Sequence, residues 1–330
     1  MQHEILKSRS HSQKNNLDPV TYETFQSDVL FGLSQPQKSL PCKWLYDASG
    51  ARLFEEITQT PEYYLTRTEI RLLQELRDEL AKGILNLDVL IEPGSGSSVK
   101  TRILLRALPQ LKQYIPIDIS EEMLLDTAQQ LRQDFPSLEI NPYVHDFSLP
   151  VPPRLKFEDS QERMVFFPGS TIGNFSPKEA QRLLRSFNAL VRHRGWLLLG
   201  VDTTQDRHRL LAAYNDSAGI TAQFNKNILV RINRELGANF DVEKFQHRAI
   251  FNSLESRVEM HLVSTQAQAV AIAGHLVVFE PGETIHTENC YKYSVENLER
   301  MAQTCGWQLE QKWGDSTSTG FNLMLFKSVE

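Results

Sequence analysis

The feature that most restricts the fold is a short apolar segment, residues 87–92, that ends in Glu92 and runs into Pro93-Gly94-Ser95-Gly96. A short apolar run bounded by a glycine-rich turn predicts a buried strand of a parallel sheet. Glycine lets the backbone of the turn take positive φ and approach a ligand closely. A helical pattern follows from about residue 100 to 108. Strand, turn and helix in this order predict a junction that can bind a ligand.

Strands and helices then alternate along the middle of the chain. Strands are predicted at residues 114–119, 140–144, 164–168 and 196–201, and a capping box, Ser176-Pro177-Lys178-Glu179, starts a helix. This alternation predicts an α/β fold, a Rossmann-like parallel sheet with helices on both faces. Residues 307–313 and 321–327 are strand-like and flank the turn-rich residues 314–317, so we expect a C-terminal antiparallel hairpin.

The region from about residue 203 to 291 breaks the alternation. Two helical patterns, residues 206–218 and 221–236, precede extended stretches near 257–263 and 275–279. We interpret residues 204–290, together with 18–66, as an inserted α+β domain that binds the substrate. Residues 67–203 and 291–330 then form the Rossmann-like domain, and the polar residues 1–17 are expected to be a flexible tail without a signal peptide.

Charge and cysteine content restrict the partners. The net charge is −6, from 35 basic and 41 acidic residues, which disfavours nucleic acids and anionic membranes and favours a small molecule. The longest apolar stretch, near residues 196–199, is too short to span a bilayer. The three cysteines are far apart and the nine histidines are scattered, so we predict no disulfide, no metal site and a cytoplasmic protein.

The glycine-rich turn leaves three interpretations open. A nicotinamide-dependent oxidoreductase would carry a third glycine, but Val99 stands at that position. The sequence Glu-x-Gly-x-Gly resembles the first motif of Rossmann-like methyltransferases, whose ligand is a sulfonium with an amino-acid moiety. The third interpretation is a plain strand–turn–helix junction.

Polar residues at the ends of later strands favour a cofactor. Asp118 ends the next strand, 22 residues after Gly96, where a carboxylate can accept hydrogen bonds from both ribose hydroxyls or simply cap a helix. Asp146 and Phe147 follow the third strand and could hold an adenine amino group and ring, although such pairs are common in loops. Asn174 follows the fourth strand, where it could bind a substrate carboxylate or form an Asx turn.

Several longer stretches match one family in order, from about residue 41 to 290. They are residues 43–48, 53–58, 61–69, 92–101, 116–120, 169–175, 213–216, 224–227, 231–237 and 287–288. Through these stretches the chain resembles the L-histidine Nα-methyltransferases of ergothioneine biosynthesis, which make hercynine, the trimethylated betaine of histidine. The resemblance implies S-adenosylmethionine as the methyl donor and S-adenosylhomocysteine as its product.

The resemblance also implies roles for individual residues. The positions that line the family's cofactor site are Tyr46, Gly94, Lys100, Asp118, Asp146 and Phe147, and those of its substrate pocket are Tyr63, Asn174, Tyr214, Met260 and Glu288. Asn174 and Tyr214 would hold the substrate carboxylate, and Glu288 would pair with the imidazole. We further hypothesise that Tyr46 or Tyr63 directs the amine lone pair towards the methyl donor. Without the resemblance, Tyr46, Tyr63 and Met260 could be packing residues, and Lys100 and Glu288 surface charges.

One position departs from the family pattern. Cys290 stands where the family commonly has a serine that helps to bind the imidazole. A thiol is a weaker donor and acceptor than a hydroxyl. We therefore expect a monomeric enzyme that converts L-histidine stepwise to its Nα-trimethyl form. The same chemistry on tryptophan, tyrosine or a derivative is the alternative, and a non-catalytic sensor of an adenosyl ligand is a further one.

Overall fold

The computed structural model describes residues 19–83, 86–149, 157–158, 161–192, 195–314 and 320–329. Its larger sheet has the strand order β13-β14-β7-β6-β2-β3-β4, and β5 also pairs with β3. The strands are β2 (Val89–Pro93), β3 (Gln113–Asp118), β4 (Glu139–Ile140), β5 (Tyr143–Val144), β6 (Arg163–Phe167), β7 (Trp196–Asp202), β13 (Trp307–Gly314) and β14 (Phe321–Ser328). β2 to β7 are mutually parallel, whereas β14 runs antiparallel to β7 and to β13. The predicted α/β sheet and its C-terminal hairpin are confirmed; residues 315–317 of the turn lie outside the described residues.

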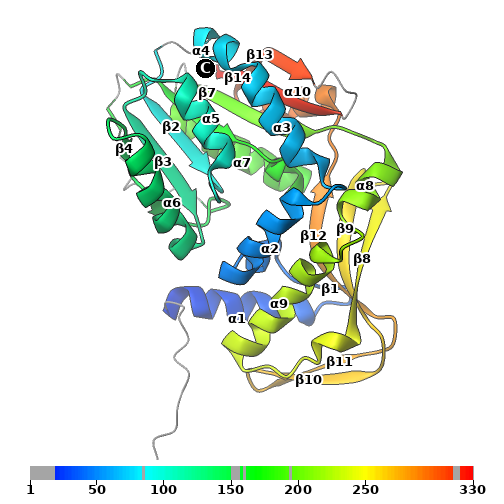
Figure 1. Cartoon of the computed structure of the whole chain (residues 1–330). Coiled ribbons are helices and arrows are strands. Elements are labelled where there is room, and N and C mark those ends of the chain that lie inside the picture. The colour runs from blue at the N-terminus through cyan, green and yellow to red at the C-terminus, as the bar shows by residue number, and fades with distance from the viewer. Residues whose placement is uncertain are drawn as a thin grey trace, which may run out of the picture.

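Helices cover both faces of this sheet (Figure 1). One face carries α3 (Tyr64–Glu75), α5 (Val99–Ala107) and α6 (Glu121–Asp134), with α4 (Arg77–Gly83) packed beside α5, and the other carries α7 (Pro177–Val191) and α10 (Val295–Gln303). Alternate strand residues feed the two cores: Leu90 packs into the first, whereas Val89 and Ile91 pack into the second. α7 begins at the predicted capping box of Ser176 and Glu179.

A second, four-stranded sheet lies beside the first (Figure 1). Its order is β1 (Lys38–Ser39), β12 (Thr284–Tyr291), β9 (Arg257–Ser264) and β8 (Phe245–Asn252), and β10 (Gln268–Ile272) and β11 (His275–Phe279) form a separate hairpin. The helices of this part are α1 (Pro19–Leu33), α2 (Ala48–Gln59), α8 (Arg207–Ala213) and α9 (Ile220–Leu236), with the short 3₁₀ helices η1 (Cys42–Leu45), η2 (Thr171–Asn174) and η3 (Val242–Lys244) between elements. β1 pairs in parallel with β12, and α2 packs on α9, so residues before 60 join those of the insertion.

One predicted helix end is wrong, and two expected domain boundaries fall inside regular elements. α8 ends at Ala213, short of residue 218, because the Asp216 carboxylate accepts the backbone N–H groups of Ile220 and Thr221 and so starts a new helix. The expected domain boundary at 66/67 falls inside the continuous helix α3, so a boundary before Tyr64 fits the helix better. The boundary at 290/291 falls one residue before the end of β12 and moves to 291/292.

Within the part of the chain that the structure describes, no helix has the length and apolarity needed to cross a membrane.

The backbone of β7 at Gly200 lies close to the side chain of Glu69 on α3. A Cβ atom there would lie 1.8 Å from Glu69 Oε1 and 3.3 Å from Pro168 Cα. Glu69 is fully buried and accepts the Gly169 N–H at 2.8 Å, so its carboxylate has little room to move. We expect Gly200→Ala to lower the free energy of unfolding by about 1–3 kcal/mol, the usual cost of overpacking, as measured by urea denaturation.

The control for this prediction is the same Gly200→Ala substitution made in a Glu69→Ala variant. If the clash with the Glu69 carboxylate is the cause, the Gly200→Ala substitution costs less in that background. An equal loss of stability in both backgrounds would show that the contact is not responsible.

Candidate functional site

A cavity of about 1570 Å³ lies beyond the carboxyl ends of β2, β3 and β6 and reaches β12 of the second sheet. Ligands of open α/β sheets bind at this edge. The cavity wall includes every residue that the sequence nominated, namely Tyr46, Tyr63, Gly94, Lys100, Asp118, Asp146, Phe147, Asn174, Tyr214, Met260, Glu288 and Cys290. Residues separated by more than two hundred positions in the chain therefore share one cavity.

The glycine-rich turn forms one wall. The buried Glu92 carboxyl accepts hydrogen bonds from Thr101 Oγ1 at 2.6 Å and Tyr114 Oη at 2.5 Å, and burial raises its pKa to about 7. Glu92 thus holds the turn against α5 and β3. Gly94 has φ +71°, and a Cβ atom there would lie 3.2 Å from the ring of Phe147. The absence of a side chain at Gly94 keeps the space between the turn and this ring open.

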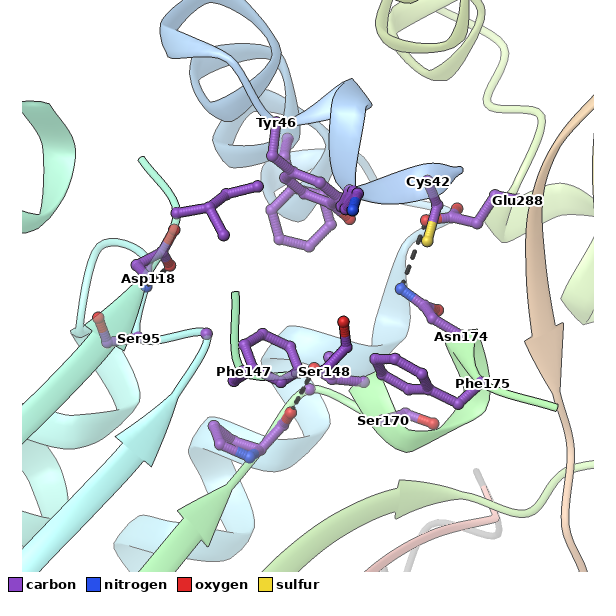
Figure 2. A pocket seen from close by; sticks show the side chains of 18 of the residues that line it. Cys42, Tyr46, Ser95, Asp118, Phe147, Ser148, Ser170, Asn174, Phe175 and Glu288 are labelled. Atoms are coloured by element: carbon purple, nitrogen blue, oxygen red, sulfur yellow. Dashed lines mark hydrogen bonds between the residues drawn. The ribbon is translucent and has the colours of Figure 1, made fainter. Parts of the chain in front are cut away.

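Asp118 lies at the end of β3 and faces the cavity (Figure 2). Its two carboxylate oxygens accept the backbone N–H groups of Gly96 at 3.2 Å and Ser120 at 2.9 Å. Loss of hydration raises the pKa of the carboxyl. Each oxygen keeps a further lone pair that can accept a ligand hydroxyl. Backbone contacts therefore fix the carboxylate in place without saturating it.

Asp146 and Phe147 form the next part of the wall. Asp146 Oδ1 accepts the N–H and the hydroxyl of Ser148, and Oδ2 lies 3.2 Å from Lys43 Nζ. The Phe147 ring packs edge-on against Phe167 and Phe175, with centroids 5.7 and 6.0 Å away. The ring is held in a fixed orientation, suited to packing against a planar ligand group.

Lys100 lies between the glycine-rich turn and Gly169. Its ammonium group is 2.6 Å from Glu69 Oε2, and the same carboxylate accepts the Gly169 N–H. The sequence nominated Lys100 but gave no role to Glu69, although Glu69 closes one of the stretches shared with the family. A carboxylate on a helix normally indicates a solvated side chain, so nothing in the sequence distinguished it.

Glu288 and Asn174 lie on the opposite side of the cavity from Asp118 (Figure 2). Glu288 is buried on β12, and burial raises its pKa to about 8. Asn174 Nδ2 donates to Glu288 Oε1 over a long 3.4 Å. Met260 on β9 is the register partner of Glu288 and adds an apolar surface. A buried carboxyl beside an amide and a thioether is suited to a planar, nitrogen-containing group.

Tyrosines close the cavity between these two sides. Tyr46 packs edge-on against Phe54 and Phe224, and the Tyr63 ring lies 6.4 Å from the Tyr214 ring. Burial raises the pKa values of all three tyrosines well above their ordinary value, so their hydroxyls stay protonated donors. Tyr214 Oη donates to Cys290 Sγ at 2.6 Å.

The sequence did not predict a buried ion pair behind this wall. Lys292 Nζ lies 2.8 Å from Asp202 Oδ2, and both side chains are fully buried. The Tyr64 hydroxyl donates to the same Asp202 oxygen at 2.7 Å. The available signal was the alternation of side chains along β12, which, continued by one residue to Lys292, places Lys292 on the same side as Cys290. Lysines are rarely buried, so this pattern alone does not indicate an ion pair.

Glu259, His261 and His286 form the group with metal-ligand chemistry that the described residues contain. Glu259 Oε1 already accepts from Arg257 at 2.7 Å and from Asn252 at 2.9 Å, and Oε2 lies 3.0 Å from His261 Nε2. A guanidinium bound to the only carboxylate of the group repels a further cation. We therefore assign no metal here, and the cluster serves to join β8, β9 and β12.

Comparison with known proteins agrees with this geometry. Residues 25–328 match the family described as histidine-specific, SAM-dependent methyltransferases. Histidine N-alpha-methyltransferase of Mycolicibacterium smegmatis is 39% identical over 298 residues, which cover 89% of this chain and 92% of that protein. The enzyme of the same name from Mycobacterium tuberculosis is 40% identical over 87% of this chain and 90% of its own length.

More distant relatives share the fold. Ergothioneine biosynthesis protein 1 of Schizosaccharomyces pombe is 28% identical and matches 87% of this chain but 39% of its own length. Among solved structures, an S-adenosylmethionine-dependent methyltransferase from Clostridium acetobutylicum superposes with a TM-score of 0.50 at 13% identity. That alignment covers 84% of this chain and 98% of the other.

The raised pKa of Glu288 predicts a pH-dependent stability. Because folding raises this pKa from 4.5 to about 8, the native protein binds more protons than the unfolded chain between these values. The contribution of Glu288 to stability then falls as the pH rises through this window. Glu288→Gln removes the titration, so we expect the stability of the variant relative to wild type to increase from about pH 5 to pH 8 by at least about 1.4 kcal/mol, the equivalent of one pKa unit.

Urea denaturation at several pH values measures this difference, and Glu243→Gln is the control. The Glu243 side chain is 89% exposed, so its substitution removes a carboxyl group from the surface and not from the cavity. A constant difference for Glu288→Gln would contradict the assignment of an uncharged Glu288 in the free protein.

Proposed function

This chain belongs to the family of SAM-dependent, histidine-specific methyltransferases, and we propose that it methylates the α-amino group of L-histidine. The observation that carries the proposal is the shared cavity, in which Glu288 and Asn174 lie opposite Asp118. The proposed nucleoside site and the proposed imidazole site thereby open into one space.

The first wall of the cavity fits S-adenosylmethionine. Asp118 has free lone pairs for the ribose hydroxyls, and the open space at Gly94 lets a ligand lie against the Phe147 ring. Asp146 is available to an adenine amino group, and Lys100 to a carboxylate. We propose these four side chains, the Gly94 backbone and Tyr46 as the cofactor-binding set. Val99, exposed where a dinucleotide-binding turn would have glycine, argues against a nicotinamide cofactor.

The opposite wall fits histidine. Glu288 can share a proton with the imidazole, because a carboxyl with a pKa of about 8 carries that proton at neutral pH. Asn174 and Tyr214 supply neutral donors for the α-carboxylate. Tyr63 and Met260 border the space between these ends. Two recognition points at opposite ends of one amino acid fix the direction of its α-amine.

S-adenosylmethionine supplies a methyl group activated by its sulfonium. The residues of this chain contribute positioning, which can account for about 7–11 kcal/mol of a barrier. We propose that Tyr46 or Tyr63 orients the amine lone pair through its hydroxyl, which stays protonated because burial raises its pKa. The proton passes to water, since an α-amine with a pKa of about 8 is partly neutral at physiological pH. The faces of the tyrosines attract the growing ammonium product.

The product and its setting follow from the same relatives. We propose stepwise conversion to Nα,Nα,Nα-trimethylhistidine, as a step of ergothioneine biosynthesis, the process named in the fungal relatives. We also propose a monomer with two domains, residues 64–203 with 292–330 and residues 18–63 with 204–291, that binds no nucleic acid. The three cysteines are free, which fits the reducing cytoplasm.

A second candidate substrate is tryptophan, tyrosine or a derivative. The observation that favours it is Cys290, whose sulfur already accepts the Tyr214 hydroxyl and lies beside Glu288 in the cavity wall. A thiol contributes less to imidazole binding than the serine common in the family.

Mass spectrometry of products tests the proposed function. Purified protein is mixed with S-adenosylmethionine and an equimolar pool of free amino acids. We expect trimethylhistidine as the main product, with mono- and dimethylhistidine appearing before it. Methylated tryptophan or tyrosine would support the same methyl-transfer mechanism with a different substrate. The absence of any methylated amino acid would refute the proposal.

Restoring the hydroxyl at residue 290 gives a second prediction. Cys290→Ser adds a stronger hydrogen-bonding group next to the imidazole, so we expect the KM for histidine to fall about two- to tenfold, the range equivalent to one hydrogen bond. Steady-state kinetics measure the change, and Cys305→Ser, also buried but outside the cavity wall, is the matched control. An unchanged KM in both variants would mean that residue 290 does not contact the substrate.

A further inference from the structure

Lys292 is a fully buried cation directly behind the substrate wall. A buried lysine is rare, and a buried ion pair seldom stabilises a fold more than apolar side chains of the same volume would. Although burial opposes the charged form, the attraction of Asp202 raises the pKa of Lys292, which therefore remains an ammonium group. A charge kept at this position calls for an explanation other than stability.

The contacts of Lys292 point towards the cavity. Its Nζ atom lies 2.8 Å from Asp202 Oδ2, 3.4 Å from Tyr214 Oη and 3.4 Å from Cys290 Sγ. The Tyr64 hydroxyl donates to the same Asp202 oxygen. The three protons of the ammonium thus have one acidic partner and two partners in the cavity wall. Asp202 and Tyr64 hold the ammonium in position behind Tyr214.

These contacts set the direction of the Tyr214 hydroxyl. Lys292 can donate to the Tyr214 oxygen, which leaves the phenolic hydrogen free to point elsewhere. In the free protein this hydrogen is donated to Cys290 Sγ, a weak acceptor. A carboxylate accepts much more strongly, because hydrogen bonds to ionised groups are about twice as strong as neutral ones. An incoming carboxylate can therefore replace the sulfur as the acceptor of Tyr214.

We propose that Lys292 is a positioning residue that makes the site selective for a free α-carboxylate. Held by Asp202, it orients and polarises the Tyr214 hydroxyl towards the carboxylate of the amino acid. The inference rests on the proposed function, and it extends that function to a substrate class: free amino acids are accepted, whereas amines, esters and peptide N-termini are not.

The wild-type enzyme provides a first test that needs no variant. L-histidine and its methyl ester differ in the charge of the carboxyl group, and histamine lacks that group. We expect the KM of the ester to exceed that of histidine about tenfold or more, the factor equivalent to one hydrogen bond to a charged group. Equal KM values for histidine and its ester would overturn the inference. An enzyme that methylates neither compound would instead refute the proposed function.

Removal of the ion pair gives the second test. Lys292→Met with Asp202→Asn removes both charges together and leaves no unpaired buried ion. We expect the KM for histidine to rise about tenfold, while kcat and the inhibition constant of histamine change less than about threefold. We expect an unchanged dissociation constant of S-adenosylmethionine, which would show that the variant is folded. Lys292→Arg keeps the charge and is expected to retain discrimination against the ester.

The same substitutions at a remote pair serve as the control. Lys112→Met with Asp88→Asn removes an ion pair of 2.7 Å at the opposite edge of the larger sheet, before β2 and β3. This variant should keep the wild-type ratio of the KM values of ester and histidine. A Lys292/Asp202 variant that binds S-adenosylmethionine and also keeps this ratio would contradict a role for Lys292 in carboxylate recognition.

Discussion

The buried ion pair between Asp202 and Lys292 is the interaction at which the two sheets and the substrate wall meet. The chain leaves the larger sheet after β7, at Asp202, and returns to it after β12, at Lys292. The pair therefore joins the two ends of the inserted segment at one point. Tyr64, at the start of α3, also contacts the pair, because its hydroxyl donates to the Asp202 carboxylate. Between these contacts, β12 lies along the carboxyl edge of the larger sheet and encloses the cavity.

The cavity has two chemically different sides because two kinds of backbone supply them. On the side of the larger sheet, the turn after β2 presents Gly94, and the end of β3 presents the Asp118 carboxylate, which two backbone N–H groups hold in place. On the other side, strands β9 and β12 present Met260, Glu288 and Cys290 from a regular ladder. Burial keeps Glu288 and the surrounding tyrosines protonated. The substrate side of the free pocket therefore offers uncharged donors to a zwitterionic amino acid, and the Lys292 ammonium lies behind the Tyr214 hydroxyl.

The sequence predicted the larger sheet well and the buried polar network poorly. Strands such as β2 and β7 are fully buried and mostly apolar, with an acidic residue at or near the carboxyl end, a pattern that predicts a strand of a parallel sheet. The helix predicted to run to residue 218 ends at Ala213, because the Asp216 carboxylate accepts N–H groups of the first turn of α9. Helix propensity alone does not predict this side-chain contact. Glu69, Asp202 and Lys292 were missed since each reads as an ordinary surface charge until its partner, far away in sequence, is known. Asn174 was nominated by its place after the fourth strand and by the family resemblance, and Glu288 by the resemblance alone; their mutual contact became apparent only in three dimensions.

The central claim is that one amino acid spans the cavity with its imidazole at Glu288 and its carboxylate at Tyr214. A crystal structure with S-adenosylhomocysteine and L-histidine tests it most directly. The account predicts the ribose hydroxyls at Asp118, the imidazole at Glu288, and the Tyr214 hydroxyl turned from Cys290 to the carboxylate. A histidine bound in the opposite direction, with its carboxylate at Glu288, or one bound outside this cavity, would contradict it.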